Sequence, residues 1–196
     1  FPEAIITNDS IEGISQIGEI PKLFITNNDE YSKTDDTQDK IIILLLDELS
    51  NSSTQNIAIL VPWKKDVEYF HNIISKKYSD CSCFHGDNDN LSNISNIHIT
   101  TFKSAKGLEF DTVIIPNLFR IVKLLSSQSN HYNVEWQDVY VAFTRARSSL
   151  FLISCKDLQV YGSSVERINM NDIPTKKIEP RKNKISYIED DDEVPF

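Results

Sequence analysis

Short apolar runs alternate with longer amphipathic stretches through the middle of the chain. Residues 57–61 (Ile-Ala-Ile-Leu-Val) form a continuous apolar run that Pro62 ends, and such a run is typical of a buried parallel strand. Residues 64–78 then repeat apolar side chains at helical spacing, which predicts an amphipathic helix that covers the sheet. Residues 39–49 are apolar almost all round, but their length and leucine content favour a helix.

The same alternation continues toward the C-terminus. Residues 97–101 and 113–115 are apolar runs on either side of a polar loop, residues 136–145 predict a helix, and residues 150–154 predict a further strand. Residues 21–26 also predict a short strand. Strands that alternate with helices predict an α/β fold, in which a parallel sheet carries helices on both faces and binds ligands at the carboxyl ends of its strands.

The periodicity divides the chain into three parts. Residues 1–20 lack a sustained period and predict an irregular N-terminal segment. Residues 21–160 contain all the expected strands and helices and form the predicted folded domain. Residues 161–196 contain few apolar groups that could offset the entropy of ordering, so we expect a flexible tail with an acidic end.

Composition sets limits on partners and compartment. The chain is 40% hydrophobic and 25% charged, and no apolar run reaches the length of a bilayer span, so we expect no membrane partner. Three cysteines are too few for a disulfide framework and favour a reducing cytoplasm. The formal net charge of −9 argues against a nucleic-acid partner. However, residues 189–193 are all acidic, so the residues before them carry a net charge of only about −4. Such a charge allows a local basic groove.

Cys81, Cys83 and His85 alternate, so a strand would project all three to one face. A zinc ion could use this trio only with a fourth ligand, and the familiar C-x-x-C spacing is absent. We therefore favour a small strand with ordinary buried thiols over a metal site.

The polar loop at residues 102–109 is rich in groups that can bind a nucleotide. Lys103, Lys106 and the free backbone N–H groups expected around Gly107 suit phosphate oxygens. Glu109 cannot bind phosphate, but its carboxylate suits hydroxyl groups such as those of a ribose. The alternative is a β-turn whose lysines are merely solvated.

A second segment, residues 138–147 (Asp-Val-Tyr-Val-Ala-Phe-Thr-Arg-Ala-Arg), favours the nucleotide interpretation. With both segments in view, the chain resembles the superfamily 1 DNA helicases of the UvrD/Rep kind. Residues 97–116 resemble the family's motif V, T-x-H-x-x-K-G-L-E-F, and residues 138–147 resemble motif VI, Y-V-A-x-T-R-A. The resemblance covers residues 21–156 and implies the second RecA-like domain of such an enzyme.

The resemblance also implies roles for single residues. ATP lies between two RecA-like domains in the family, and Arg145 matches the arginine that stabilises charge on the γ-phosphoryl oxygens. A structural alternative is that Arg145 pairs with a carboxylate of the sheet, and we interpret Arg147 as a surface or structural arginine. The other matches are the ribose ligand Glu109, the phosphate-proximal Gly107 and Lys106, and the single-strand-facing Thr101, Lys103 and Ser104.

The chain departs from the family pattern at two positions. Lys103 stands where the family usually has histidine, and a cation there still suits a phosphate. Pro62 stands where the family commonly has a motif IV arginine that contacts the γ-phosphate, and Lys64 is a candidate substitute. Two function classes therefore stay open: the motor domain of an ATP-dependent DNA helicase, and a degenerate DNA- or protein-binding adaptor without ATPase activity.

The chain lacks the G-x-x-x-x-G-K-[ST] loop that cradles a nucleotide, so we expect an upstream first RecA-like domain. The resemblance implies that this domain supplies the Walker lysine and the carboxylates that hold Mg²⁺, and that residues 1–196 alone hydrolyse no ATP. The Lys-Gly-Leu-Glu-Phe sequence resembles the group of helicases that move 3′ to 5′.

The last eight residues, Glu-Asp-Asp-Asp-Glu-Val-Pro-Phe, resemble the acidic tips of bacterial single-stranded DNA-binding proteins. Phe196 and its carboxylate suit a basic pocket with an apolar floor, which would make the tail a docking peptide for a protein partner. The alternative, which we favour, is a solvated acidic end.

Overall fold

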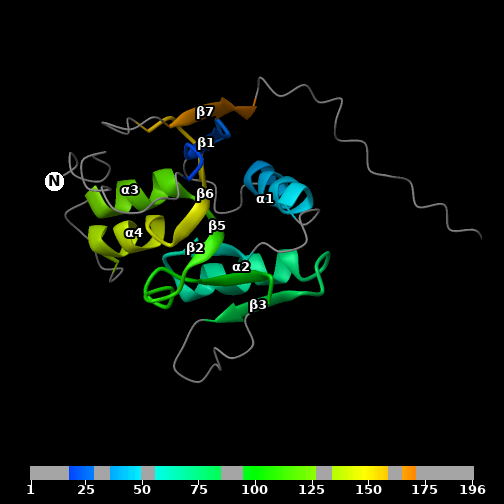
Figure 1. The fold of residues 1–196 in the computed structure, drawn as a ribbon. Coiled ribbons are helices and arrows are strands. Elements are labelled where there is room, and N and C mark those ends of the chain that lie inside the picture. Colours follow the sequence, from blue (N-terminus) through cyan, green and yellow to red (C-terminus); the bar gives the residue numbers. More distant parts are fainter. Residues whose placement is uncertain are drawn as a thin grey trace, which may run out of the picture.

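The computed structural model describes residues 18–28, 36–49, 56–84, 95–126, 134–158 and 165–170 (Figure 1). These residues form four helices and seven strands. The helices are α1 (Asp36–Leu49), α2 (Lys64–Ile74), α3 (Leu118–Ser126) and α4 (Trp136–Phe143). The strands are β1 (Lys22–Ile25), β2 (Ile57–Val61), β3 (Cys81–Phe84), β4 (Ile97–Thr101), β5 (Phe110–Ile115), β6 (Ala146–Ser154) and β7 (Glu166–Asn169).

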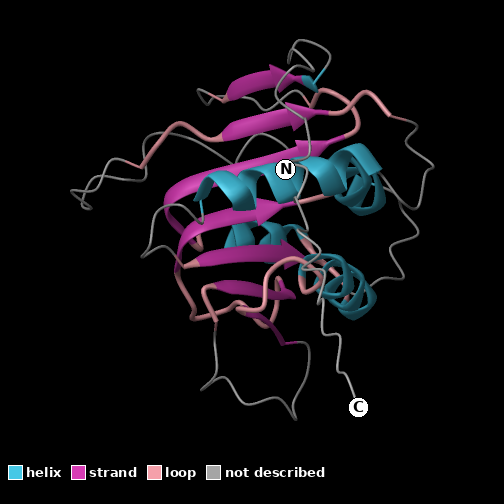
Figure 2. Ribbon diagram, turned by 90° about the vertical axis from the view of Figure 1, so that its right-hand side faces the viewer, coloured by secondary structure: helices cyan, strands magenta, loops and turns pink. Residues whose placement is uncertain are grey.

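All seven strands belong to one sheet with the order β3-β4-β2-β5-β6-β1-β7. Every pair of neighbours is parallel, and the arrows in Figure 2 accordingly point the same way. The order confirms the predicted parallel α/β sheet. Since the strands are parallel, the segments that follow β4, β2, β5 and β6 all begin at the carboxyl ends of the strands, where the sequence analysis expects ligands. Glu109 and Arg145 instead precede β5 and β6, and so lie at the amino ends of these strands.

Helices cover both faces of the sheet, with α3 and α4 on one side and α1 and α2 on the other (Figure 1). The apolar core on the first side joins Leu118 and Val139 of these helices to Phe102 and Phe110 beside the polar loop. On the second side, α1 and α2 bury apolar side chains against β2, β4 and β6. Continuous apolar strands such as β2 are buried over their whole length because both faces are covered.

Several boundaries differ from the prediction, and the largest differences lie toward the C-terminus. Residues 166–169 pair with β1 in parallel register, so a flexible tail beginning at residue 161 is wrong for this stretch. β6 begins at Ala146 rather than at residue 150, because its polar first half still pairs with β5. α4 therefore ends at Phe143. Residues 1–17 and 171–196, which include the acidic end, lie outside the described residues.

Cys81 and Cys83 lie on β3, as predicted, and both are half-buried free thiols. Burial raises the pKa of the Cys81 thiol to about 11, so this cysteine is an unreactive thiol near neutral pH. His85, the third member of the possible zinc trio, lies outside the described residues. In the part of the chain that the structure describes, no helix is long and apolar enough to cross a membrane.

His98 is an ionisable group buried on β4, next to the edge strand β3, with only 2% of its surface exposed. Its Nδ1 atom lies 2.8 Å from the Ser82 hydroxyl of β3, and its ring stacks on Phe110 at 6.0 Å between centroids. Its Nε2 atom is buried and has no hydrogen-bond partner among the described residues. Burial lowers the pKa of His98 from 6.5 to about 4.

We predict that His98 makes the fold sensitive to mild acid. Because the folded-state pKa lies below the unfolded value, the neutral ring's stabilisation is fully present above pH 6.5 and is lost as pH falls toward 4. The loss should reach at most about 3 kcal/mol in the free energy of unfolding. Urea unfolding of wild type and His98→Gln at pH 7.5, 6 and 5 measures it. His71→Gln is the control, and an equally steep acid dependence in His98→Gln contradicts the assignment.

Candidate functional site

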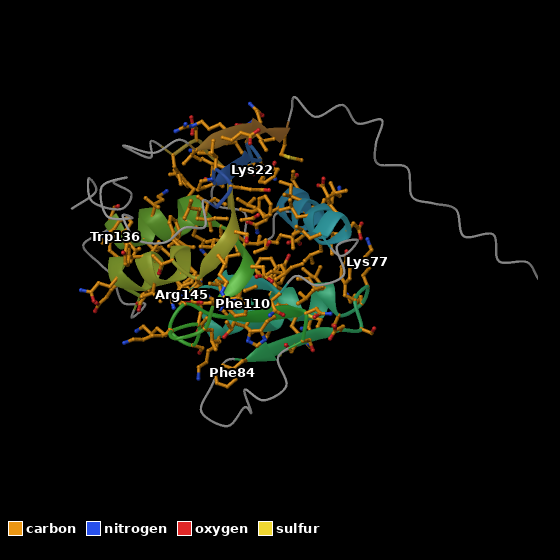
Figure 3. All side chains as sticks on the ribbon, viewed as in Figure 1. Lys22, Lys77, Phe84, Phe110, Trp136 and Arg145 are labelled. Carbon is orange, nitrogen blue, oxygen red and sulfur yellow. The ribbon has the colours of Figure 1, made fainter. Side chains whose placement is uncertain are left out.

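The two polar segments singled out in the sequence meet at the amino-terminal ends of β5 and β6. Phe110 pairs with Ala146 across these strands, and the Phe110 N–H donates to the Arg145 carbonyl oxygen over 2.9 Å. Arg145 and Phe110 accordingly lie close together in Figure 3, whereas Trp136 marks the far end of α4. Residues 97–116 and 138–147, which lie apart in sequence, therefore form one continuous surface.

The loop between β4 and β5 is a series of tight turns held by its own hydrogen bonds. The Ser104 N–H donates to the Thr101 hydroxyl oxygen over 3.1 Å, and the two hydroxyl groups lie 2.9 Å apart. Gly107 has φ +86°, a left-handed conformation that glycine adopts without strain. A Cβ atom at Gly107 would meet nothing within 4 Å, so the backbone conformation, rather than crowding, favours glycine there.

Two expectations for this loop are wrong in detail. The N–H groups of Lys106 and Leu108 donate to the Lys103 and Ala105 carbonyl oxygens over 3.3 and 3.0 Å, so they are not free for a phosphate. Thr101 is buried at 7% exposure, and its side chain shapes the turn instead of facing outward. The side chains of Lys103 and Lys106 and the backbone of Gly107 are exposed.

Arg145 holds the end of α4 against the loop. Its Nε donates to the Val141 carbonyl over 2.9 Å, its Nη1 to the Leu108 carbonyl over 3.1 Å and its Nη2 to the Thr144 hydroxyl over 3.0 Å. Its hydrogen-bond partners among the described residues are thus neutral oxygens and not the sheet carboxylate that the structural alternative required. The planar fork of arginine suits such divergent acceptors, whereas a lysine could not satisfy them together.

Glu109 pairs with Arg147 at the start of β6. Both the Nε and the Nη2 of Arg147 donate to Oε2 of Glu109, over 2.9 and 2.8 Å. Both side chains are more than half exposed, at 56% and 55%, so water screens the pair and it contributes little to stability. The ion pair therefore holds the predicted ribose ligand in place without burying it.

Lys103 reaches the first turn of α4. Its Nζ lies 3.9 Å from Oδ2 of Asp138, and the same oxygen accepts a hydrogen bond from the Glu135 N–H over 2.9 Å. Glu135 and Asp138 form a reciprocal capping box that satisfies two N–H groups at the helix start. The loop and the helix are thus joined at both ends of α4, by Lys103 at its start and by Arg145 at its finish.

The turn after β2 holds the position that departs from the family pattern. Pro62 and Trp63 lead into α2, whose first turn forms hydrogen bonds from Asp66 and Val67 to the Trp63 carbonyl. Lys64 is the first residue of that helix and is exposed. Because β2 lies beside β4, Lys64 lies at the carboxyl ends of the strands, as Lys103 does. Arg145 precedes β6 and lies at the opposite end.

Sequence reasoning missed two contacts in this region. It interpreted Arg147 as a surface or structural arginine but did not name its partner Glu109. It also gave no role to Arg120, whose guanidinium lies 5.1 Å from the Trp63 ring centroid. Neither contact has a local sequence signal, since the partners are far apart in the chain. The Glu135-x-x-Asp138 capping box does have one, a pair of carboxylates three residues apart before an apolar run.

We predict that Arg145 contributes more to stability than Arg147 does. Arg145→Ala removes three charge-assisted hydrogen bonds at a half-buried position, which should lower the free energy of unfolding by about 1.5–3 kcal/mol. Arg147→Ala breaks an exposed pair and should cost about 0.2–1 kcal/mol. Urea denaturation of both variants tests the ranking, and equal costs for the two variants contradict the anchoring role of Arg145.

Part of this chain is similar to a known protein family. The family model for the UvrD-like helicase C-terminal domain matches residues 81–157, which include the loop, α4 and β6. A comparison with curated proteins gave no match.

Solved structures share the fold. The C-terminal domain of a possible DNA helicase from Lactobacillus plantarum WCFS1 is 19% identical, with a TM-score of 0.55 over 76% of this chain and 86% of that one. The C-terminal domain of a Dbp5 variant from S. cerevisiae, bound to Gle1 and IP6, is 15% identical, with a TM-score of 0.53 over 79% and 92%. A Dbp5 variant bound to RNA and ADP BeF3 is 13% identical, with a TM-score of 0.55 over 80% of this chain and 43% of that one.

The family match and the fold agree on the same part of the molecule. The matched residues run from β3 to just beyond β6, and they contain both polar segments of the candidate site. The solved helicase domain shares the parallel sheet in which those segments meet. Residues 81–157 are therefore similar to the UvrD-like helicase C-terminal domain, and the parallel sheet that contains them has the RecA-like fold of solved helicase domains.

Proposed function

We propose that this chain is the second RecA-like motor domain of an ATP-dependent DNA helicase. The observation that supports the proposal is the direct contact between the motif V and motif VI segments. The Phe110 N–H donates to the Arg145 carbonyl, and Nη1 of Arg145 donates to the Leu108 carbonyl. A surface built from both segments can touch a nucleotide with one side and a nucleic acid with the other, which is what a motor domain requires. The direction of movement, 3′ to 5′, rests on the Lys-Gly-Leu-Glu-Phe sequence alone.

Arg145 is the proposed catalytic residue. Its guanidinium stabilises the charge that develops on the γ-phosphoryl oxygens of ATP, as a planar and permanently charged donor does best. To reach them, it exchanges its hydrogen bonds to the Val141 and Leu108 carbonyls for phosphate oxygens. Lys106 and Gly107 are exposed on the same loop as Leu108. Lys64, the candidate replacement for the motif IV arginine, follows β2 at the opposite end of the strands from Arg145.

Glu109 is the proposed ribose ligand. Its carboxylate is exposed and held by Arg147, so a ribose hydroxyl can approach it without displacing buried groups. The remaining parts of the ATP site, which are the phosphate-cradling loop and the carboxylates for Mg²⁺, belong to a first RecA-like domain. This domain is the proposed partner of the surface around α4.

Two observations favour the runner-up, a helicase-like adaptor without ATPase activity. Pro62 stands at the position where the family commonly has the motif IV arginine. In addition, the Arg145 guanidinium is already bound to oxygens of its own domain. The measurement of turnover below decides between the two functions.

We expect Arg145→Ala to lower the ATP turnover number of the complete protein about a thousandfold while ATP binding changes little. The reason is that the arginine acts mainly on transition-state charge. Phosphate release with single-stranded DNA present measures turnover, and a fluorescent ATP analogue measures binding. Arg167→Ala, an exposed arginine paired with Asp157 on the edge strand, is the control. Wild-type turnover in Arg145→Ala refutes the catalytic role, and no turnover in the unmodified protein favours the adaptor.

Lys103→Ala should weaken binding of single-stranded DNA about equally for every sequence, because a phosphate contact carries no base information. The slope of log affinity against log salt should become shallower by roughly 0.7, the value for one phosphate contact on a single strand. Lys22→Ala at the opposite end of the strands is the control. Unchanged affinity and slope place Lys103 outside the DNA contact.

A further inference from the structure

Arg147 lies one position beyond the last residue that matches motif VI, Y-V-A-x-T-R-A, so the resemblance gives it no role in the reaction. Its guanidinium nevertheless contacts the proposed ribose ligand. Both Nε and Nη2 donate to the same oxygen, Oε2 of Glu109, over 2.9 and 2.8 Å. The other carboxylate oxygen, Oε1, accepts no hydrogen bond from the described residues. One oxygen of Glu109 is therefore held, and the other is left for a ligand.

The strand register places Glu109 and Arg147 on the same side. Phe110 pairs with Ala146, and both side chains pack into the apolar core beside α3 and α4. Successive side chains of an extended chain point to opposite faces, so Glu109 before Phe110 and Arg147 after Ala146 project away from this core. The backbone thus brings the two charged groups together at the surface.

The strand that carries Arg147 is bounded on both sides. β5 pairs with β6 on one side, and on the other the Glu19 N–H donates to the Ser148 carbonyl over 2.8 Å. Gly18 approaches so closely that an added Cβ atom would lie 3.1 Å from the same carbonyl oxygen. The backbone of Arg147 therefore has little room to shift, and its guanidinium is directed at Glu109 before any ligand arrives.

The ion pair orients a side chain more than it stabilises the fold. Arg147 is 56% exposed and Glu109 is 55% exposed, so water screens their attraction. The two hydrogen bonds still restrict the Glu109 carboxylate to one orientation. A glutamate without this restraint would lose rotamer freedom when a ligand binds, which would weaken binding. The geometry therefore favours a role for Arg147 in ligand recognition.

A carboxylate that binds the sugar of a nucleotide has two requirements. It needs a free oxygen that can accept a hydrogen bond from a hydroxyl group, and its negative charge must not repel the nearby phosphates. Arg147 meets both requirements, because it occupies only Oε2 of Glu109 and balances the negative charge. A lysine would supply the charge but not the planar pair of N–H donors.

We propose that Arg147 is the positioning residue that makes Glu109 selective for a ribose hydroxyl. Oε1 of Glu109 accepts the hydrogen of that hydroxyl, and a nucleotide without it leaves Oε1 unpaired. Arg147 acts through Glu109 and does not touch the sugar. The proposal rests on the proposed function, which supplies ATP at Glu109, and it adds sugar selectivity and the residue that controls it.

The test compares hydrolysis of ATP, 2′-deoxyATP and 3′-deoxyATP by the complete protein with single-stranded DNA present. The unmodified protein should have a lower KM for ATP than for the analogue that lacks the hydroxyl bound by Glu109. Arg147→Ala should raise the KM for ATP roughly fivefold, as expected when one hydrogen bond is weakened. The KM for that analogue should change little. The kcat should also change little, because the sugar contact is the same in the ground state and the transition state.

Three further variants separate positioning from a merely structural effect. Arg147→Lys keeps the charge without the paired donors, so its selectivity should lie between those of wild type and Arg147→Ala. Glu109→Ala/Arg147→Ala should have the same selectivity as Glu109→Ala, because Arg147 acts only through Glu109. Arg167→Ala is the matched control. Arg167 also forms an exposed pair, with Asp157 over 3.0 Å, and its removal should leave the selectivity unchanged.

The outcomes distinguish this proposal from the function on which it rests. Unchanged selectivity in Arg147→Ala, together with lost selectivity in Glu109→Ala, overturns the role of Arg147 and leaves the helicase proposal standing. A further loss in the double variant also overturns it, since Arg147 then acts independently of Glu109. Equal KM values of the unmodified protein for all three nucleotides overturn it as well. Hydrolysis of none of them overturns both proposals together.

Discussion

The parallel pairing of β5 with β6 is the contact on which the candidate site depends. One strand follows the lysine-rich loop and the other follows α4, and the Phe110 N–H bond to the Arg145 carbonyl fixes where the two segments meet. If this register slipped by one residue, the inward and outward faces of the strand would exchange, and the buried side chains of Val113 and Ile115 would face the opposite layer. Burial of both faces prevents such a slip, so the core fixes the geometry of an exposed site.

Much of the fold could be predicted because its strands are short apolar runs with clear ends. β2 and β4 have the predicted bounds, and the motif segments lie where parallel topology requires. β7 was missed because Glu-Arg-Ile-Asn is mostly polar, and only its neighbour β1 makes it a strand. The first half of β6 was missed for the same reason. Pairing partners that are distant in sequence decide such cases, and a local pattern does not contain them.

The candidate site was predictable in its residues but not in its contacts. Two motifs located Lys103, Glu109 and Arg145, yet the acceptors of each side chain depend on packing between elements. Arg145 binds backbone carbonyls, which have no sequence signature, and Glu109 meets an arginine 38 positions away. Net charge alone argued against a nucleic-acid partner, but residues 189–193 carry five acidic side chains and leave a net charge of about −4 for the rest of the chain. Distribution over the surface, rather than the sum, decides what binds.

The anchoring of Arg145 has a thermodynamic consequence. A ligand that binds the Arg145 guanidinium removes its hydrogen bonds to the Leu108 and Val141 carbonyls, which then bind water. The measured affinity of the ligand therefore includes the free energy of breaking these two hydrogen bonds. Linkage makes the effect reciprocal: whatever tightens the loop around Leu108 makes the arginine harder to withdraw, and whatever loosens the loop makes it easier. A single side chain thereby connects the occupancy of one end of α4 to the conformation of the neighbouring loop, without any movement of the sheet.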